Sequence, residues 1–281
     1  MKVALCCIGK NENRYIREYV DHYRTIGVDK IFLFDNNDPD GERFEEVIQP
    51  EIDSGFVEIT DYRGEKVCQT KSYQECYDKH GGEYDWICFF DCDEFWWSYK
   101  FSSIKDFLNQ RKFSPFDIIH INWLCFGDNG QLRYEDKPLR ERFPKHMPLD
   151  TVIAFKKQNI PENCHIKSIV RGNRIVYWED GPHTPKPSRH LMCCNVFGNE
   201  SNPENFVDNM VDGCFLTLNE SCLYHYSTKT AEEYALKMKR GFPDQVINNQ
   251  IIKYLVETRF FGVNEKTKEK EDMINEILWE N

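Results

Sequence analysis

Short apolar runs alternate with segments of helical periodicity through the first hundred residues, and this alternation limits the fold more than any other feature. The apolar runs are residues 3–8, 31–34, 56–60 and 86–90. The helical segments between them are residues 12–26, 44–52 and 70–80, and Pro50 should break or end the second. Since strands and helices that alternate in this way pair into parallel sheets, the sequence predicts an α/β fold. Its central sheet should be Rossmann-like, mostly parallel and flanked by helices.

The pattern loosens after residue 97. Further helices are predicted at residues 104–111, 230–241 and 244–261, and further strands at 118–123, 151–156, 167–171, 174–178 and 223–226. Thr230 and Glu233 form a capping-box pattern that should open the second of these helices. Residues 128–150 and 198–213 are expected to be loops, the latter mobile, and the charged tail from Glu265 is expected to fray or pack weakly.

Composition excludes some classes of function. The 281 residues carry 47 acidic and 36 basic side chains, a formal net charge of −11, which argues against broad nucleic-acid binding. The start is too short and too soon polar for a signal peptide, and no run approaches the roughly 18 to 20 apolar residues of a spanning helix. We therefore expect a cytoplasmic protein, or one peripheral to the inner face of a membrane. Its twelve scattered cysteines should be free, mostly buried thiols.

An apolar strand runs directly into acidic residues at Asp91-Cys92-Asp93-Glu94. Carboxylates this close repel one another and are costly to bury unpaired, so a positive group should lie beside them. Asp91 and Asp93 form a D-x-D pair that could hold Mn²⁺ or Mg²⁺, because these cations prefer carboxylate oxygens and leave positions open for phosphates. The plainer alternative is a solvated acid-rich turn.

Two histidines are candidates for a third metal ligand. His225 follows a short apolar strand and precedes the capped helix, whose Lys237 and Arg240 could reach a diphosphate. The simpler alternative for His225 is a core histidine whose hydrogen bonds are all made within the protein. The simpler alternative for Lys237 and Arg240 is that positive side chains are favoured near the carboxyl terminus of a helix. His183, in a Pro-flanked loop, is a rival ligand or an acceptor-side residue. Trp123 could stack on a sugar, although aromatic side chains more often fill a core.

The other predicted strands also end in polar residues. Glu12, Asp35, Asp61 and Asp128 are candidates for ribose or base contacts, or for a general base. Ligands bind beyond the carboxyl ends of strands in open α/β sheets, so these side chains should share one edge with the D-x-D pair.

Several of these motifs together resemble glycosyltransferase family 92 and its family 2-like relatives. The resemblance covers roughly residues 3–242. The matching stretches are Gly9-Lys10-Asn11-Glu12 with Tyr15, Glu18 to His22, Gly27, Phe34-Asp35-Asn36-Asn37, Gln69 ahead of the Tyr73–Cys76 helix, Phe90-Asp91-Cys92-Asp93-Glu94-Phe95, Trp123 with Phe126-Gly127, and His225-Tyr226 with Lys237 and Arg240-Gly241.

The resemblance implies a GT-A fold and metal-dependent sugar transfer from a nucleotide-sugar donor, with inversion at the anomeric carbon. The metal would lie at Asp91, Asp93 and His225, and the base would be Asp128 or Glu94, although Asp128 is not part of the family motif. Trp123 and His183 would lie on the acceptor side. The residues expected at the donor are Lys10, Asn11, Glu12, Asp35, Asn36, Gln69, Lys71, Asp91, Lys237 and Arg240.

The same resemblance divides the chain at residue 242. Residues 1–242 would form the GT-A domain, with a nucleotide-sugar half at 1–97 and a smaller, mixed acceptor half at 98–242, and residues 243–281 a helical extension. The donor would be a UDP-sugar, with galactose as the candidate sugar, and the acceptor a glycan or glycolipid of a bacterial surface polysaccharide or lipopolysaccharide. Two alternatives stay open: a metal-dependent nucleotidyltransferase or phosphohydrolase, and a non-catalytic carbohydrate-binding module.

Overall fold

The structure is a computed structural model that describes residues 1–148, 152–155, 158–161, 164–179, 181–187, 191–202 and 220–280. Its amino-terminal part alternates strands and helices as predicted. These elements are β1 (Val3–Gly9), α1 (Asn13–Thr25), β2 (Lys30–Asp35), α2 (Glu45–Asp53), β3 (Val57–Asp61), α3 (Gln69–His80) and β4 (Trp86–Phe89). Pro50 lies inside α2 instead of ending it, and the helix is kinked at Ile48.

The second part of the chain is more irregular, also as predicted. Its elements are β5 (Glu94–Trp97), α4 (Ile104–Leu108), η1 (Arg111–Phe113), β6 (Ile118–Cys125), α5 (Leu139–Arg142), β7 (Val152–Phe155), β8 (Gln158–Pro161), β9 (Ile166–Arg171), β10 (Val176–Tyr177), β11 (Lys186–Pro187), β12 (Cys193–Asn195), β13 (Cys222–His225), α7 (Ala231–Arg240), α8 (Asn249–Leu255), η3 (Val256–Phe260) and α9 (Lys268–Trp279). The capping box at Thr230 and Glu233 is present. The predicted loop 198–213 lies mostly outside the described residues.

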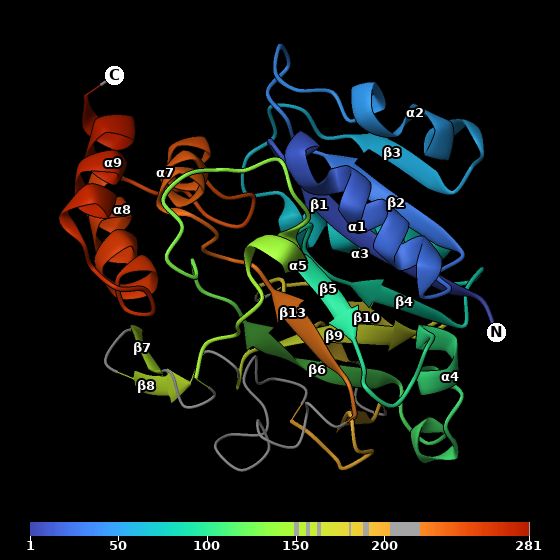
Figure 1. The fold of residues 1–281 in the computed structure, drawn as a ribbon. Coiled ribbons are helices and arrows are strands. Elements are labelled where there is room, and N and C mark those ends of the chain that lie inside the picture. Colours follow the sequence, from blue (N-terminus) through green and yellow to red (C-terminus); the bar gives the residue numbers. More distant parts are fainter. Residues whose placement is uncertain are drawn as a thin grey trace.

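The main sheet of the described residues has nine strands (Figure 1). Its order is β3-β2-β1-β4-β9-β6-β13-β5, with β12 beside β6. The first four strands are parallel, and β6, β12 and β13 are parallel to one another, whereas β9 and β5 run antiparallel to their neighbours. A mostly parallel sheet with the acidic motif directly after β4 confirms the predicted α/β, GT-A-type fold.

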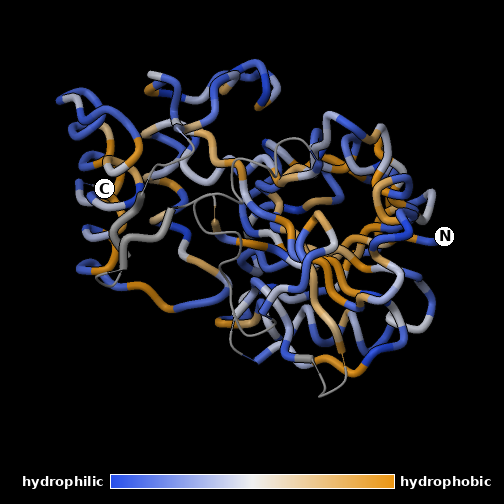
Figure 2. The backbone as a smooth tube through the Cα atoms, turned by 90° about the horizontal axis from the view of Figure 1, so that it is seen from below, coloured by the Kyte–Doolittle hydropathy of each residue, from blue (hydrophilic) through white to orange (hydrophobic). Residues whose placement is uncertain are grey.

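Strand β1 is buried on both faces, which explains its unbroken apolar sequence. Val3, Leu5 and Cys7 pack in the same core cluster as the apolar side of α1. The alternate residues of β1 pack in a second cluster with α3. Figure 2 shows the resulting concentration of apolar chain in the strands, and this rigid centre fixes the positions of the strand ends.

Helices α7, α8 and α9 gather to one side of the sheet, with the carboxyl terminus among them (Figure 1). Met273 and Ile274 on α9 are buried in a cluster with Tyr234 and Met238 of α7. The expectation that the charged tail frays or packs weakly was therefore wrong. Apolar residues at helical spacing within that tail bury one face against α7.

All the described cysteines are free and buried, as predicted. Within the same residues, we find no helix with the length and apolar character needed to cross a bilayer.

Candidate active site

The carboxyl ends of the parallel strands form one side of a cavity of about 150 Å³, which we call the D-x-D cavity. Side chains from the ends of β1, β4 and β13 and from α7 line it. Ten of the predicted site residues are among its lining residues: Lys10, Glu12, Gln69, Asp91, Asp93, Trp123, His183, His225, Lys237 and Arg240. Sequence segments more than two hundred residues apart therefore meet at one edge of the sheet.

Asp91 has one carboxylate oxygen fully engaged with the protein. Its Oδ1 accepts hydrogen bonds from Gln69 Nε2 at 2.7 Å and from the Tyr73 hydroxyl at 2.9 Å. The same oxygen lies 2.7 Å from the ammonium of Lys167, and the Asp91 side chain keeps 30% exposure. Three donors on one oxygen fix the rotamer of the carboxylate, whose exposed portion lies at the cavity.

Lys167, at the start of β9, is a site residue that the sequence analysis missed. Its side chain is fully buried and lies 3.8 Å from Glu94 Oε2 as well as beside Asp91. Burial would lower the pKa of this lysine, but the charges of Asp91 and Glu94 outweigh burial and raise it. The positive group that the acidic cluster requires is therefore supplied partly by the protein itself.

Glu94 lies beneath the cavity, at the start of β5. It is fully buried, and its Oε2 accepts a hydrogen bond from the Asp91 backbone N–H at 2.8 Å. Burial raises its pKa well above the ordinary range, although the charge of Lys167 opposes this. Glu94 is not among the lining residues of the D-x-D cavity, so the structure does not favour it as a base. That role stays an untested prediction.

Asp93 carries the second charge pair of the site. Its Oδ2 lies 2.7 Å from Lys237 Nζ on α7, and its Oδ1 lies 3.6 Å from His225 Nε2. Burial alone would raise the pKa of Asp93, but the neighbouring charges, Lys237 foremost, lower it well below the usual range. Asp93 is therefore an anion throughout the physiological pH range.

The two candidate histidines both contact the Trp123 indole. Ring centroids are 4.1 Å apart for Trp123 and His225, and 5.4 Å for Trp123 and His183. Burial lowers the pKa of each histidine to about 3, so both are neutral at physiological pH and can offer a nitrogen lone pair. His183 Nδ1 lies 2.9 Å from the Ile166 carbonyl and must carry the proton there, which leaves the lone pair on Nε2.

The turn after β1 is tied to the end of α7. Arg240 donates to Glu12 Oε1 at 2.6 Å and to the Asn11 carbonyl at 3.1 Å. The Asn11 backbone is left-handed, with φ of 54°, and its N–H donates to Asn37 Oδ1 at 2.7 Å. Lys10 Nζ lies 2.7 Å from Asp38 Oδ1. Lys10 and Glu12 line the D-x-D cavity, whereas Asn11 does not.

Besides Asn11, three predicted donor residues do not line this cavity. Asp35 is buried and ion-paired with Arg63 at 2.5 Å. The Asn36 side chain donates to the carbonyls of Tyr62 and Glu65, each at 2.9 Å. Lys71 is exposed on the outer side of α3, with its ammonium 5.1 Å above the Tyr62 ring. The structure gives the first two a role in ordering the strand ends, and contact with a donor stays a prediction for all three.

Asp128 is held by the carboxyl-terminal helix. Its Oδ2 lies 2.5 Å from Lys270 Nζ on α9, and its backbone N–H donates to Asn264 at 2.7 Å. It does not line the D-x-D cavity. A carboxylate paired in this way is poorly placed to accept a proton in that cavity, so its role as base also stays an untested prediction.

The segment after α7 crosses the D-x-D cavity and contributes a carboxylate that the sequence analysis missed. The Pro243 carbonyl accepts N–H bonds from Cys68 at 2.8 Å and from Gln69 at 3.1 Å, which docks the segment on the start of α3. The next residue, Asp244, lines the cavity, and burial raises its pKa above the ordinary value.

Comparison with known proteins decides the family. The model of glycosyltransferase family 92 matches residues 2–179, which is more than half of the chain. This chain belongs to glycosyltransferase family 92. The match confirms the predicted family.

Curated relatives share the family name. A family 92 protein of Oryza sativa subsp. japonica is 28% identical over 138 residues, which are 48% of this chain and 23% of the relative. One from Ricinus communis is 25% identical over 131 residues, 46% of this chain and 23% of the relative. The matched region thus spans about a quarter of the length of these plant proteins.

Similar solved structures are remote. Staphylococcus aureus TarS 1–349 aligns over 99% of this chain and 71% of its own, with 11% identity and a TM-score of 0.40. A Pyrobaculum calidifontis mannosyltransferase, solved in complex with GDP-Man and Mn²⁺, aligns over 43% of this chain and 35% of its own, at 9% identity and a TM-score of 0.34.

The side chains of the D-x-D cavity offer the kinds of ligand atom that a hard divalent cation prefers. In the described part of the chain, no three His, Cys, Asp or Glu side chains are grouped as a complete metal site. Mg²⁺ and Mn²⁺ do not need one, since they commonly bind one or two carboxylates together with substrate phosphates and water. Asp91 and Asp93 would supply the carboxylates, and neutral His225 lies beside them.

Proposed function

We propose that this protein transfers a sugar from a UDP-sugar to a glycan or glycolipid, with Mn²⁺ or Mg²⁺ as cofactor. The observation that carries the proposal is the convergence of Asp91, Asp93, His225, Lys237 and Arg240 on one cavity in a family 92 chain. An acidic protein needs such local positive charge to hold an anionic donor. A bound cation would neutralise the diphosphate and stabilise it as a leaving group.

The protein's own residues would divide the remaining work. Lys237 and Arg240 line the cavity and pair with its acids Asp93 and Glu12, and both could bind phosphate oxygens by charge-assisted hydrogen bonds. Lys167 would keep Asp91 oriented from below. Trp123 and His183 would bound the space for the sugar and the acceptor.

Inversion requires a base that removes a proton from the acceptor hydroxyl. Of the described residues that line the cavity, four carry carboxylates: Glu12, Asp91, Asp93 and Asp244. Glu12 is paired with Arg240, and the D-x-D acids are assigned to the metal. We therefore assign the base to Asp244, because burial raises its pKa above the ordinary value and a carboxylate with a raised pKa accepts a proton more readily.

The proposal also includes the transferred sugar and the product. Galactose is the candidate sugar, and a surface polysaccharide or lipopolysaccharide the candidate product. The matched curated relatives are plant proteins, so the bacterial setting rests on the sequence analysis alone.

Turnover of a donor panel tests the proposal. The protein is incubated with UDP-, GDP- and other nucleotide sugars, Mn²⁺ and a glycan extract, and released UDP and the sugar product are both measured, with and without EDTA. We expect release of UDP that EDTA abolishes and that Asp244→Asn slows by about 10²-fold or more. Release of UMP and a sugar phosphate would instead indicate phosphohydrolase chemistry, and no release with any donor would reject the proposal.

A further inference from the structure

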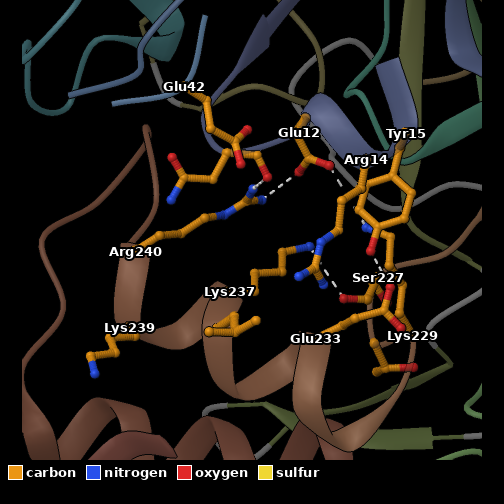
Figure 3. Close-up of a pocket in the computed structure, with 13 residues that line it drawn as sticks. Glu12, Arg14, Tyr15, Glu42, Ser227, Lys229, Glu233, Lys237, Lys239 and Arg240 are labelled. Atoms are coloured by element: carbon orange, nitrogen blue, oxygen red, sulfur yellow. Dashed lines mark hydrogen bonds and ion pairs between the residues drawn. The ribbon is translucent and has the colours of Figure 1, made fainter. Parts of the chain in front are cut away.

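A second cavity of about 320 Å³, which we call the basic cavity, lies beside the D-x-D cavity. Figure 3 shows it between the first turn of α1, which carries Arg14 and Tyr15, and α7, which carries Lys237 and Arg240. Its floor is the turn between β13 and α7, residues 227–229. Its volume is at the lower end of the roughly 300–1,000 Å³ of small-molecule sites.

Positive side chains outnumber negative ones around this cavity. Its basic lining residues are Arg14, Lys229, Lys237, Lys239 and Arg240, and its acidic ones are Glu12, Glu42 and Glu233. Glu233 is paired with Arg142 at 3.1 Å and Glu12 with Arg240 at 2.6 Å, while Lys237 is paired with Asp93 at 2.7 Å. The remaining lining charges are those of Arg14, Lys229 and Lys239 against Glu42. The cavity therefore keeps an excess of positive charge in a protein whose overall charge is −11.

Lys229 is the residue that most clearly points to a ligand. It is only 5% exposed, yet its ammonium lies 3.9 Å from Glu12 Oε2, beyond hydrogen-bond distance, and 4.3 Å from the centre of the Tyr15 ring. Its backbone is in the left-handed region, with φ of 51°, which lysine rarely adopts. Backbone strain of this kind clusters at ligand sites, where it aims a side chain.

The basic cavity and the D-x-D cavity share a wall made by Glu12, Ser227, Lys237 and Arg240. A ligand in the basic cavity would therefore lie one side chain away from a donor in the other. In the proposed function, a cation at Asp91 and Asp93 together with Lys237 and Arg240 would hold the donor's diphosphate in the D-x-D cavity. An anion at Lys229 and Arg14 would then come from a second molecule.

We propose that the basic cavity binds the anionic group of an acidic acceptor sugar, a carboxylate or a phosphate ester. This inference deepens the proposed transferase function and rests on it. Lys229 supplies a fixed charge at the floor, and Arg14, exposed on α1 with its guanidinium 4.4 Å from the Tyr134 ring, supplies a second charge at the rim.

Binding of small acidic sugars tests the proposal without donor or metal. Glucuronic acid, glucose 6-phosphate and neutral glucose are titrated into the full chain by NMR, and into the Lys229→Met and Arg14→Gln variants. Lys79→Met, which removes an exposed lysine on α3, is the matched control. We expect both acids, or one of them, to bind at least 10-fold more tightly than glucose. Each cavity variant should lose at least 5-fold in affinity, and the control none.

The two acids distinguish a carboxylate site from a phosphate site. Equal binding of acidic and neutral sugars would overturn the proposal, and so would acid binding that neither cavity variant weakens. Arg14→Gln keeps the test valid if the buried Lys229 variant does not fold. Mn²⁺-dependent UDP binding is measured on the same samples. If the acids bind but UDP does not, the proposed function fails and so does the acceptor role of this cavity. If UDP binds and the acids do not, only the present inference fails.

Discussion

Replacing Lys167 by methionine should destabilise the protein by about 3–5 kcal/mol, which is the typical cost of breaking a buried ion pair from one side. The side chain is fully buried, with its ammonium 2.7 Å from Asp91 Oδ1 and 3.8 Å from Glu94 Oε2. Methionine keeps most of the volume, so packing contributes little. Asp91 can regain some hydration because it is 30% exposed, which favours the lower end of the range.

Urea unfolding followed by circular dichroism measures this loss. Lys79→Met is the matched control, since Lys79 is 59% exposed and pairs with Glu58 at 3.3 Å. Because this is a surface pair, its loss in Lys79→Met should change the free energy of unfolding by at most about 1 kcal/mol. A double-mutant cycle that combines Lys167→Met with Asp91→Asn should show a coupling free energy of about 1 kcal/mol or more between the two side chains. Equal effects of the two lysine variants, or strictly additive effects in the cycle, would refute the reasoning.

Three other predictions concern different parts of the molecule. His225→Ala should weaken Mn²⁺ affinity, measured by EPR of free Mn²⁺, while the circular dichroism spectrum stays unchanged; unaltered affinity would remove His225 from the ligand set. Burial lowers the pKa of His120 from 6.5 to about 4. The neutral histidine therefore contributes to stability above pH 6.5, and this contribution, up to about 3 kcal/mol, is lost as the pH falls toward 4. His120→Gln should flatten that slope, and an unchanged slope would exclude the histidine. Ile274→Ala on α9 should cost about 2–5 kcal/mol, because the side chain is buried against α7; no loss in urea unfolding would mean that α9 does not pack there.

The parts of the site that sequence predicted are those encoded locally. Strand β4 reads as an apolar run, and the acids Asp91 and Asp93 follow it directly, so both position and chemistry could be predicted. The ends of parallel strands must share an edge, which brought Glu12 into the same prediction. His225 was a candidate for a different reason, because a short apolar strand precedes it and a helix with Lys237 and Arg240 follows it.

Lys167 could not be placed in this way. It begins β9, which runs antiparallel between β4 and β6, so its first residues reach the edge where the parallel strands end. That strand order is set by tertiary pairing and not by any local pattern. The one signal available was a lysine inside the predicted strand 167–171, because a cation buried in a strand needs an acidic partner.

The carboxyl-terminal helix was missed for a different reason. The tail is rich in Lys and Glu, and charge dominated its interpretation. Met273, Ile274 and Ile277 nevertheless recur at helical spacing, and α7 offers the surface that covers them. The pairing of Asp128 with Lys270 follows from that packing, which is why Asp128 seemed available as a base from sequence alone.

Calorimetric titration of UDP in the presence and absence of Mn²⁺ tests the central claim most directly. The claim is that Asp91 and Asp93 hold a cation that binds the donor's diphosphate. We predict that wild-type protein binds UDP only with Mn²⁺, that Asp93→Asn weakens this binding at least tenfold, and that Asp53→Asn, at an exposed position on α2, leaves it unchanged. UDP binding that neither EDTA nor Asp93→Asn reduces would contradict it.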